Sequence, residues 1–184
     1  MEQQAELVKE LEGDILRVVK DQNGNHVVQK IIELVPRQHL DFIINCLKGR
    51  VSELSSHTYG CRVIQRVLEH GTEADKAAIM AELHQCVPML ITDQYGNYVT
   101  QHVIQHGKPE DRSKIIAIVT KDLLVFSKHK FASNVVEKCI EQGSPEELSR
   151  IREGLSVAGD EPGSPMLVLI KDQYGNYVIR KSWL

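Results

Sequence analysis

The sequence repeats one polar phrase at a nearly fixed interval, and this repetition restricts the possible folds more than any other feature. Five ten-residue windows carry the phrase: DQNGNHVVQK (21–30), HTYGCRVIQR (57–66), DQYGNYVTQH (93–102), HKFASNVVEK (129–138) and DQYGNYVIRK (172–181). Their starts lie 36, 36, 36 and 43 residues apart. A constant period in this range is typical of a solenoid, in which each repeat is one supersecondary unit stacked on the next.

Each period contains three segments with helical spacing of apolar residues, and no strand-like alternation stands out. In the first period, a short apolar segment (14–19) precedes a second segment (25–35) with apolar residues three and four positions apart. A third segment (36–49) opens with Pro36, which suits a first helical turn, and closes with Gly49. We therefore expect an all-α fold, an α-solenoid of three-helix repeats about 36 residues long.

The period also predicts the repeat boundaries. We expect repeats at 14–49, 50–85, 86–121 and 122–164, the end of a preceding repeat at 1–13, and the start of a further, truncated repeat at 165–184. The longer last interval is explained by SVAGDEPGSP (156–165), whose glycine, proline and serine residues predict a surface loop. Solenoids usually end in capping repeats, and neither end has one, so we expect part of a longer array.

Composition favours an intracellular, non-catalytic chain. The formal net charge is −3, no apolar run approaches the length of a membrane span, and the N-terminus lacks the regions of a signal peptide. We expect a cytoplasmic monomer without membrane contact. No two of the four cysteines have metal-knuckle spacing, so we expect free thiols at Cys46, Cys61, Cys86 and Cys139.

One pair of residues suggests chemistry, and the repeat explains it otherwise. His57 and Cys61 stand four residues apart, as a metal pair or a Cys–His dyad could. His57, however, occupies the repeat position that holds Asp21 in the first window, which indicates a structural role. No third ligand or phosphate-binding glycine loop is nearby. We expect no catalytic residue, no metal site and no cofactor.

The five windows resemble the RNA-reading helices of the Pumilio (PUF) family, over essentially the whole chain. The resemblance is to the C-terminal half of a Pumilio homology domain. It implies a right-handed crescent whose concave face binds single-stranded RNA, one base per repeat and antiparallel to the repeats. It also implies repression or decay of messages through sites in their 3′ untranslated regions, with repressor or deadenylase-complex proteins on the convex face.

Three positions in each window vary while their neighbours stay apolar. They are the first, second and fifth residues after the small glycine or alanine. The first and fifth lie one helical turn apart on one face, and the second lies beside them. We expect the first and fifth side chains to meet the edge of one base. These edge pairs are Asn25/Gln29, Cys61/Gln65, Asn97/Gln101, Ser133/Glu137 and Asn176/Arg180.

The functional groups of each edge pair predict a base. Two amides can satisfy the acceptor–donor–acceptor edge of uracil, so the first and third windows should read uracil. One glutamine amide matches adenine in the second window, and the carboxylate of Glu137 can accept from both donors of guanine. Arg180 is donor-only, so cytosine competes with uracil in the fifth window. With antiparallel binding, the predicted site is 5′-(U/C)GUAU-3′.

Two further columns extend this interpretation. The second positions should stack on bases, with Asn134 as the weakest platform: His26, Arg62, Tyr98, Asn134 and Tyr177. The sixth positions form a basic column that could meet phosphates although the chain is acidic overall: Lys30, Arg66, His102, Lys138 and Lys181. Alternatively, these cations only complement the dipoles of helix C-termini. We also expect Asp21, Asp93 and Asp172 to cap the helix that follows each of them.

A different class of function is also compatible with the fold. Solenoids of the armadillo and HEAT type bind peptides, so the chain could be a protein–protein interaction scaffold with weak or no RNA binding. The edge pairs argue against this alternative, because a peptide-binding surface has no reason to pair serine with glutamate and asparagine with glutamine at one fixed offset.

Overall fold

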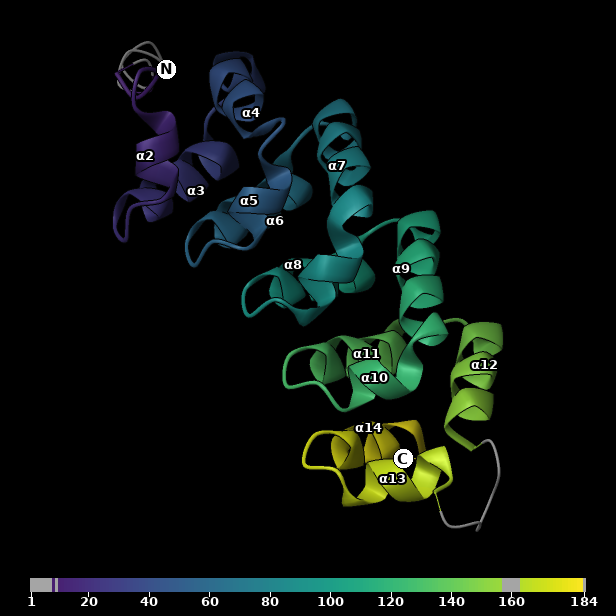
Figure 1. Ribbon diagram of the computed structural model, residues 1–184. Helices are drawn as coiled ribbons and strands as arrows, with labels where there is room; N and C mark the ends of the chain where they lie inside the picture. Colours follow the sequence, from purple (N-terminus) through teal and green to yellow (C-terminus); the bar gives the residue numbers. More distant parts are fainter. Residues whose placement is uncertain (1–7, 9, 157–162, 184) are drawn as a thin grey trace. The chain divides into compact units, whose positions relative to one another are not determined.

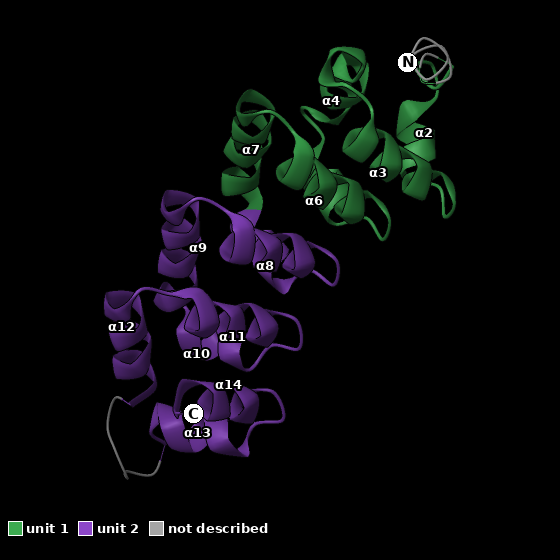
Figure 2. Cartoon of the chain, turned by 180° about the vertical axis from the view of Figure 1, so that it is seen from behind, with its two compact units in different colours: residues 1–86 green, residues 87–184 purple. Residues whose placement is uncertain are grey.

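The computed structural model describes residue 8, residues 10–156 and residues 163–183, and every regular element in these ranges is a helix (Figure 1). The all-α prediction is therefore confirmed. The chain divides into two compact units, Met1–Cys86 and Val87–Leu184 (Figure 2). Among the described helices, none combines the length and apolar character that crossing a membrane requires.

Unit 1 contains two successive helical repeats. The first consists of α2 (Ile15–Val19), α3 (Gly24–Leu34), the 3-10 turn η1 (Arg37–His39) and α4 (Asp41–Leu47). The second consists of α5 (Val51–Ser55), α6 (Gly60–His70) and α7 (Glu73–Thr92), of which the residues up to Cys86 belong to this unit. The two window helices, α3 and α6, pack against each other.

Unit 2 continues the same three-helix order. It contains α8 (Gly96–His106), α9 (Pro109–Lys121), α10 (Leu123–Ser127), α11 (Ala132–Gln142), α12 (Pro145–Ser156), α13 (Pro165–Lys171) and α14 (Gly175–Trp183). The window helix α11 lies between the window helices α8 and α14 and contacts both (Figure 1). Window helices of neighbouring repeats are thus side by side within each unit.

The apolar residues of the windows supply the core of each repeat. In α6, Val63, Ile64 and Val67 are completely buried, and α11 buries Val135 and Val136 in the same way. Burying such a side chain contributes about 1.5–3 kcal/mol, so these positions fix which face of each window helix is turned to solvent. The polar positions of the windows are thereby carried to a defined surface.

A small residue is required where each window helix begins. A Cβ atom on Gly24 or Gly60 would lie 2.7 Å from a backbone carbonyl oxygen of the preceding short helix. Real Cβ atoms do not approach so closely, so a larger residue would push the two helices apart. In the fourth window this position holds Ala132, which is completely buried.

A bidentate ion pair joins η1 to α7 within unit 1. Arg37 donates from Nε to Asp75 Oδ2 at 2.5 Å and from Nη2 to Oδ1 at 2.7 Å. The Arg37 guanidinium holds the pKa of Asp75 down to about 2, although burial of this carboxyl opposes the shift. The hydroxyl of Thr72 also donates to Asp75, so the buried carboxylate is well satisfied.

One helix start differs from the sequence-based expectation. Pro36 does not open a helix: its φ of −55° and ψ of 135° are extended, and α4 begins only after η1. The predicted repeat boundary between residues 85 and 86 lies within α7, which runs from Glu73 to Thr92 and contains Pro88. The predicted segment 1–13 and the loop 156–165 lie partly outside the described residues.

Candidate nucleic-acid interface

The variable positions have the same environment in nearly every window. The first position is buried in four windows and half-buried at Asn176. The second is exposed in all five, and the fifth is half-buried in four windows and exposed at Arg180. Each window helix therefore presents one exposed side chain next to a partly exposed one, with the first position beneath them.

An aspartate fixes the start of three window helices, as predicted. Asp21 Oδ1 accepts hydrogen bonds from the backbone N–H groups of Asn23, at 2.9 Å, and Gly24, at 2.7 Å. Asp93 and Asp172 accept from the two equivalent N–H groups at 2.6–2.9 Å. These bonds lower the pKa of Asp21 and Asp172, because they stabilise the charged carboxylate.

Histidine makes the same cap in the other two windows. His57 Nδ1 accepts from the N–H groups of Tyr59, at 3.1 Å, and Gly60, at 3.2 Å. His129 Nδ1 accepts from the equivalent pair at 3.2 and 3.3 Å. Both Nδ1 atoms must be unprotonated to accept these bonds. His57 is therefore a helix cap, as its place in the repeat predicts, and no group of three metal ligands forms among the described residues.

In the first and third windows, the asparagine holds the glutamine. Asn25 Nδ2 donates to the carbonyl oxygens of Asp21, at 2.9 Å, and Gln22, at 2.8 Å, and its Oδ1 accepts from Gln29 Nε2 at 2.9 Å. Asn97 and Gln101 repeat this arrangement. The expectation that both amides are open to a base needs correction, because both N–H groups of each asparagine are already donated to the backbone.

The second window lacks this support. Cys61 is buried and its Sγ donates weakly to the carbonyl oxygen of Thr58, at 3.6 Å. With no asparagine beside it, Gln65 has its Nε2 buried without a hydrogen-bond partner in the part of the chain that the structure describes. A buried donor without a partner costs about 1–3 kcal/mol, which favours any turn of the Gln65 amide that brings Nε2 to an acceptor on a ligand.

The fourth window contains the only carboxylate among the five edge pairs. Glu137 is half-buried beside the buried Ser133. Burial raises the pKa of Glu137, and the nearby charge of Glu141 acts in the same direction, while Lys181 and Arg180 oppose it. The carboxylate thus lies among positive charges at the surface of α11 and α14, and both its oxygens are acceptors when it is ionised.

The fifth window departs from the other four. Asn176 Nδ2 donates to the carbonyl oxygen of Asp172 at 2.8 Å, as the other asparagines do. The guanidinium of Arg180, however, lies over the ring of Tyr177 at 5.7 Å from its centroid, in cation–π contact. Arg180, which we expected to meet the edge of a base, is thus stacked on Tyr177, which we expected to stack on the plane of that base.

Comparison with known proteins connects these windows to a family. The sequence profile of the Pumilio-family RNA binding repeat matches residues 14–47, 50–84, 86–120, 123–155 and 166–182. The chain belongs to the Pumilio family. Each matched segment of this Pumilio chain contains one of the five windows, so the repeats are defined by the same residues that form the candidate interface.

Solved structures of Pumilio proteins resemble the chain throughout its length. The Puf3 RNA binding domain bound to Cox17 RNA 3′ UTR recognition sequence site A is 46% identical, with a TM-score of 0.90 over 98% of this chain and 56% of that one. PUF-8 in complex with PBE-RNA is 40% identical, with a TM-score of 0.92 over 100% of this chain and 54% of that one. The chain thus spans just over half the length of these relatives.

The Puf4 RNA binding domain is a more distant match. It was solved bound to the HO endonuclease RNA 3′ UTR recognition sequence, and it is 30% identical to the chain. The TM-score is 0.86, over 99% of this chain and 57% of that one.

The basic column of this Pumilio chain is balanced by glutamates. Lys30 pairs with Glu33 at 2.9 Å and Arg66 with Glu69 at 2.5 Å, each within one helix. Glu141 accepts from both Lys138 and Lys181 at 2.5 Å. Sequence reasoning missed these acidic partners, although glutamate three residues after the cation was a readable signal in three windows. His102 instead lies against His106, with ring centroids 4.9 Å apart.

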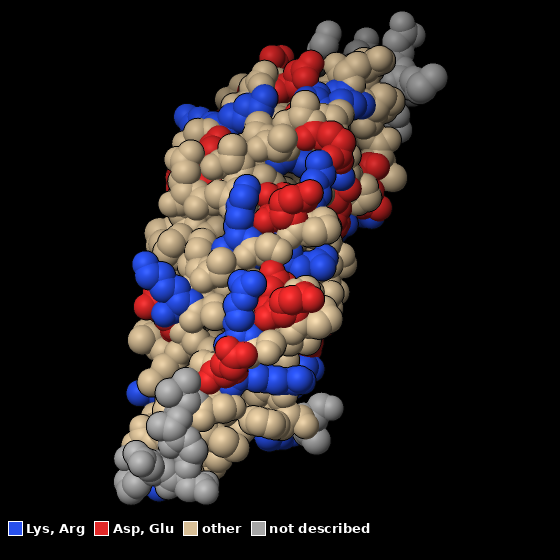
Figure 3. Space-filling model, turned by 90° about the vertical axis from the view of Figure 1, so that its right-hand side faces the viewer, with Lys and Arg blue, Asp and Glu red and all other residues tan. Residues whose placement is uncertain are grey.

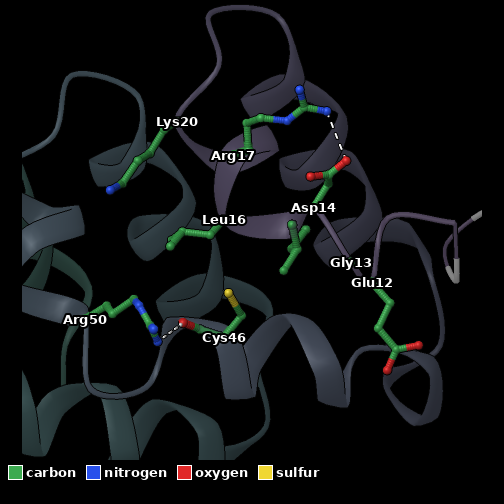
Figure 4. A pocket seen from close by; sticks show the side chains of 9 residues that line it. Glu12, Gly13, Asp14, Leu16, Arg17, Lys20, Cys46 and Arg50 are labelled. Atoms are coloured by element: carbon green, nitrogen blue, oxygen red, sulfur yellow. Dashed lines mark hydrogen bonds and ion pairs between the residues drawn. The ribbon is translucent and has the colours of Figure 1, made fainter.

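Other surface features show no comparable organisation. On the face seen in Figure 3, basic and acidic side chains are interspersed. In unit 1, an open hollow of about 510 Å³ lies beside α2, Cys46 and Arg50 (Figure 4). Among the residues that line it, Arg17 pairs with Asp14 at 2.9 Å and Arg50 donates to the carbonyl of Cys46. None of the variable window positions lines this hollow.

Proposed function

We propose that the chain binds single-stranded RNA in a sequence-specific manner, with one base per repeat and 5′-(U/C)GUAU-3′ as its core site. The observation that carries this proposal is the recurrence of one register on five helices: a first position that is buried in four windows and half-buried at Asn176, an exposed second position and a more accessible fifth. The functional groups of these side chains differ between windows while the pattern of burial stays the same, as a surface that distinguishes bases requires. The solved relatives crystallised with RNA support the same function.

Uracil suits the first and third windows. With Asn25 holding one Nε2 hydrogen of Gln29, the glutamine keeps its Oε1 as an acceptor for uracil N3–H. Its second Nε2 hydrogen remains as a donor to a uracil carbonyl oxygen. The asparagine therefore acts mainly by orienting the glutamine amide, and Gln101 is oriented by Asn97 in the same way.

Adenine and guanine suit the second and fourth windows. Adenine N1 would supply the acceptor that Gln65 Nε2 lacks, and its N6 amino group would donate to Oε1. The two N–H donors of guanine would both be accepted by the Glu137 carboxylate, with Lys181 and Arg180 nearby to favour the ionised form. In the fifth window, Arg180 has no acceptor for uracil N3–H, so cytosine competes with uracil there.

The cellular role follows from the family. Sites in 3′ untranslated regions are named in the solved Puf3 and Puf4 complexes, and we propose the same class of target for this chain. Binding there would mark messages in the cytoplasm for repression or decay. Repressor or deadenylase-complex proteins would be recruited by surfaces other than the window helices.

Fluorescence anisotropy with short labelled RNAs tests the proposal. We expect UGUAU or CGUAU, in a neutral flank and at one fixed salt concentration, to bind about 5- to 150-fold more tightly than the same RNA with adenine in place of guanine, since a mismatch costs about 1–3 kcal/mol. The comparison of the first two RNAs decides between uracil and cytosine at Arg180.

The same titrations decide against the proposal if all these RNAs bind alike or not at all. Circular dichroism on the same sample then separates two causes. A folded chain without base preference favours the scaffold alternative, whereas loss of helical signal means that the isolated chain does not keep its fold.

A further inference from the structure

The acidic partners of the basic column lie on the candidate interface itself. Glu33 follows Gln29 by four residues and Glu141 follows Glu137 by four, so each glutamate lies one helical turn beyond a base-edge residue on the same face. The cations lie likewise one turn beyond the stacking positions His26 and Asn134. Cation and glutamate are thus both next to where a bound strand would pass.

We propose that Glu33 and Glu141 limit RNA affinity by competing with RNA phosphates for the cations at the sixth window positions. This inference rests on the proposed RNA-binding function. It assigns the glutamates a role outside base reading: they keep the ammonium groups occupied until a phosphate displaces them.

The geometry around Glu141 makes the competition strongest there. One carboxylate holds two ammonium groups from neighbouring window helices, with Lys138 Nζ on Oε2 and Lys181 Nζ on Oε1, both at 2.5 Å. The side chain of Glu141 is 29% exposed and that of Lys181 42% exposed, so solvent and a phosphate oxygen can reach the pair. Ion pairs this accessible are weak and exchange readily.

The charge state supports the same role. The two lysines lower the pKa of Glu141 by hydrogen bonding to it, so it is ionised at neutral pH, and the same contact raises the pKa of Lys181. A carboxylate and a phosphate offer lysine the same kind of charge-assisted hydrogen bond. Moving an ammonium group from the carboxylate to a phosphate therefore changes the free energy little. The loss of the ion pair with glutamate largely offsets the free energy gained from the phosphate contact.

The pair at Glu33 separates this role from a structural one. Glu141 bridges α11 and α14, so its loss could also loosen the packing of two repeats. Glu33 pairs with Lys30 on the same helix, α3, and the Lys30 side chain is 67% exposed. Removing the Glu33 charge frees Lys30 by breaking an ion pair that lies within one helix, and it also removes the attraction of this carboxylate to the charges of Arg66 and His70 on α6.

The experiment compares Glu33→Gln, Glu141→Gln and the wild type in anisotropy titrations with UGUAU RNA at about 50 mM and about 200 mM salt. Each variant is expected to bind several-fold more tightly than the wild type at the lower salt. This advantage should shrink by about 2.6-fold at the higher salt for each additional phosphate that a freed cation neutralises, because affinity for single strands scales as salt to a power of about −0.7 per neutralised phosphate.

Two controls isolate the cause. Glu153→Gln removes one acidic charge from α12, where the carboxylate accepts from Ser149, and should leave affinity unchanged. Adding Lys138→Ala to Glu141→Gln should remove a large part of the increase in affinity, because one of the freed ammonium groups is absent.

Equal or weaker binding by both Glu33→Gln and Glu141→Gln, with unchanged helical signal, would overturn the inference, as would an equal increase in affinity from Glu153→Gln. These outcomes leave the proposed function standing as long as the wild type still distinguishes guanine from adenine. If the wild type binds no RNA, the proposed function itself fails.

Discussion

At the scale of the residue, the environment of a side chain decides what it can read. Gln29 and Gln65 occupy the same position of their windows, yet one has its amide held by Asn25 and the other has a buried Nε2 without a partner among the described residues. A glutamine at the fifth position can therefore present different amide groups to a base, depending on the residue at the first position. In the proposed function, the first and fifth positions therefore act as a pair.

Glu137 offers the sharpest residue-scale prediction. Glu137→Gln should relax the requirement for guanine. A carboxylate offers one acceptor oxygen to each of the two guanine N–H groups, whereas an amide offers one oxygen and places a donor opposite the second N–H. The preference for UGUAU over the RNA with adenine in place of guanine should fall about 5- to 150-fold, which corresponds to about 1–3 kcal/mol for one lost base contact. Anisotropy titrations with both RNAs measure it, and an unchanged preference would contradict the assigned chemistry.

The same residue predicts a dependence on pH. Guanine reading needs the carboxylate, and burial raises the pKa of Glu137 above the ordinary value for glutamate. Guanine preference should therefore be complete above this raised pKa and be lost as the pH falls through it, earlier than for an exposed glutamate. Histidines also titrate in this range, so Glu137→Gln is the control: its base preference should not change with pH over the same interval.

At the scale of the element, the start of each window helix depends on one acceptor. Aspartate supplies it in three windows and histidine in two, and both bind the same pair of backbone N–H groups. Aspartate accepts at any pH where it is ionised, whereas histidine accepts through Nδ1 only when neutral. The caps of α6 and α11 thus require a neutral histidine ring, whereas the caps of the other three window helices use an aspartate carboxylate.

His57→Asp tests this dependence. Burial, together with the charge of Lys20, lowers the pKa of His57, so the folded state favours the neutral ring. Its stabilising effect is present above the unfolded pKa and is lost as the pH falls through the lowered folded value. Between about pH 7.5 and about pH 5, the variant should lose less stability than the wild type, by roughly 0.5–2 kcal/mol, the typical value of a helix cap.

Urea unfolding followed by circular dichroism at the two pH values measures this difference. His129 and the other histidines are common to both proteins and cancel in the comparison. Parallel loss of stability in the wild type and His57→Asp would mean that the ring does not act as a pH-dependent cap.

At the scale of the whole molecule, the proposed function ties the number of bases read to the number of windows. Two edge pairs belong to unit 1 and three to unit 2, and each unit carries its pairs on adjacent packed helices. The chain covers just over half of its solved relatives, so a shorter site than theirs is expected from this chain alone.

We therefore predict that base preference is confined to five consecutive nucleotides. Scanning every position of a longer RNA by substitution should give about fivefold or larger losses at the bases read by the first four windows, and changes near the measurement error outside the core. A strong preference at a position outside the core would show that residues other than the five edge pairs read bases.

The sequence by itself determined the repeat, the helical fold and the positions of the edge pairs. These are local properties: the period, the spacing of apolar residues and the small residue before each pair are all readable along one dimension. Asp21 could be recognised as a cap for the same reason, since its acceptor lies only two and three residues from the donors.

Only the tertiary structure decided how the polar side chains are engaged. That Gln65 Nε2 is buried, and that Glu141 bridges lysines of successive window helices, depends on atoms that folding brings together. Burial and hydrogen-bond partners are set by three-dimensional packing, and a one-dimensional pattern records which groups are present but not which of them meet.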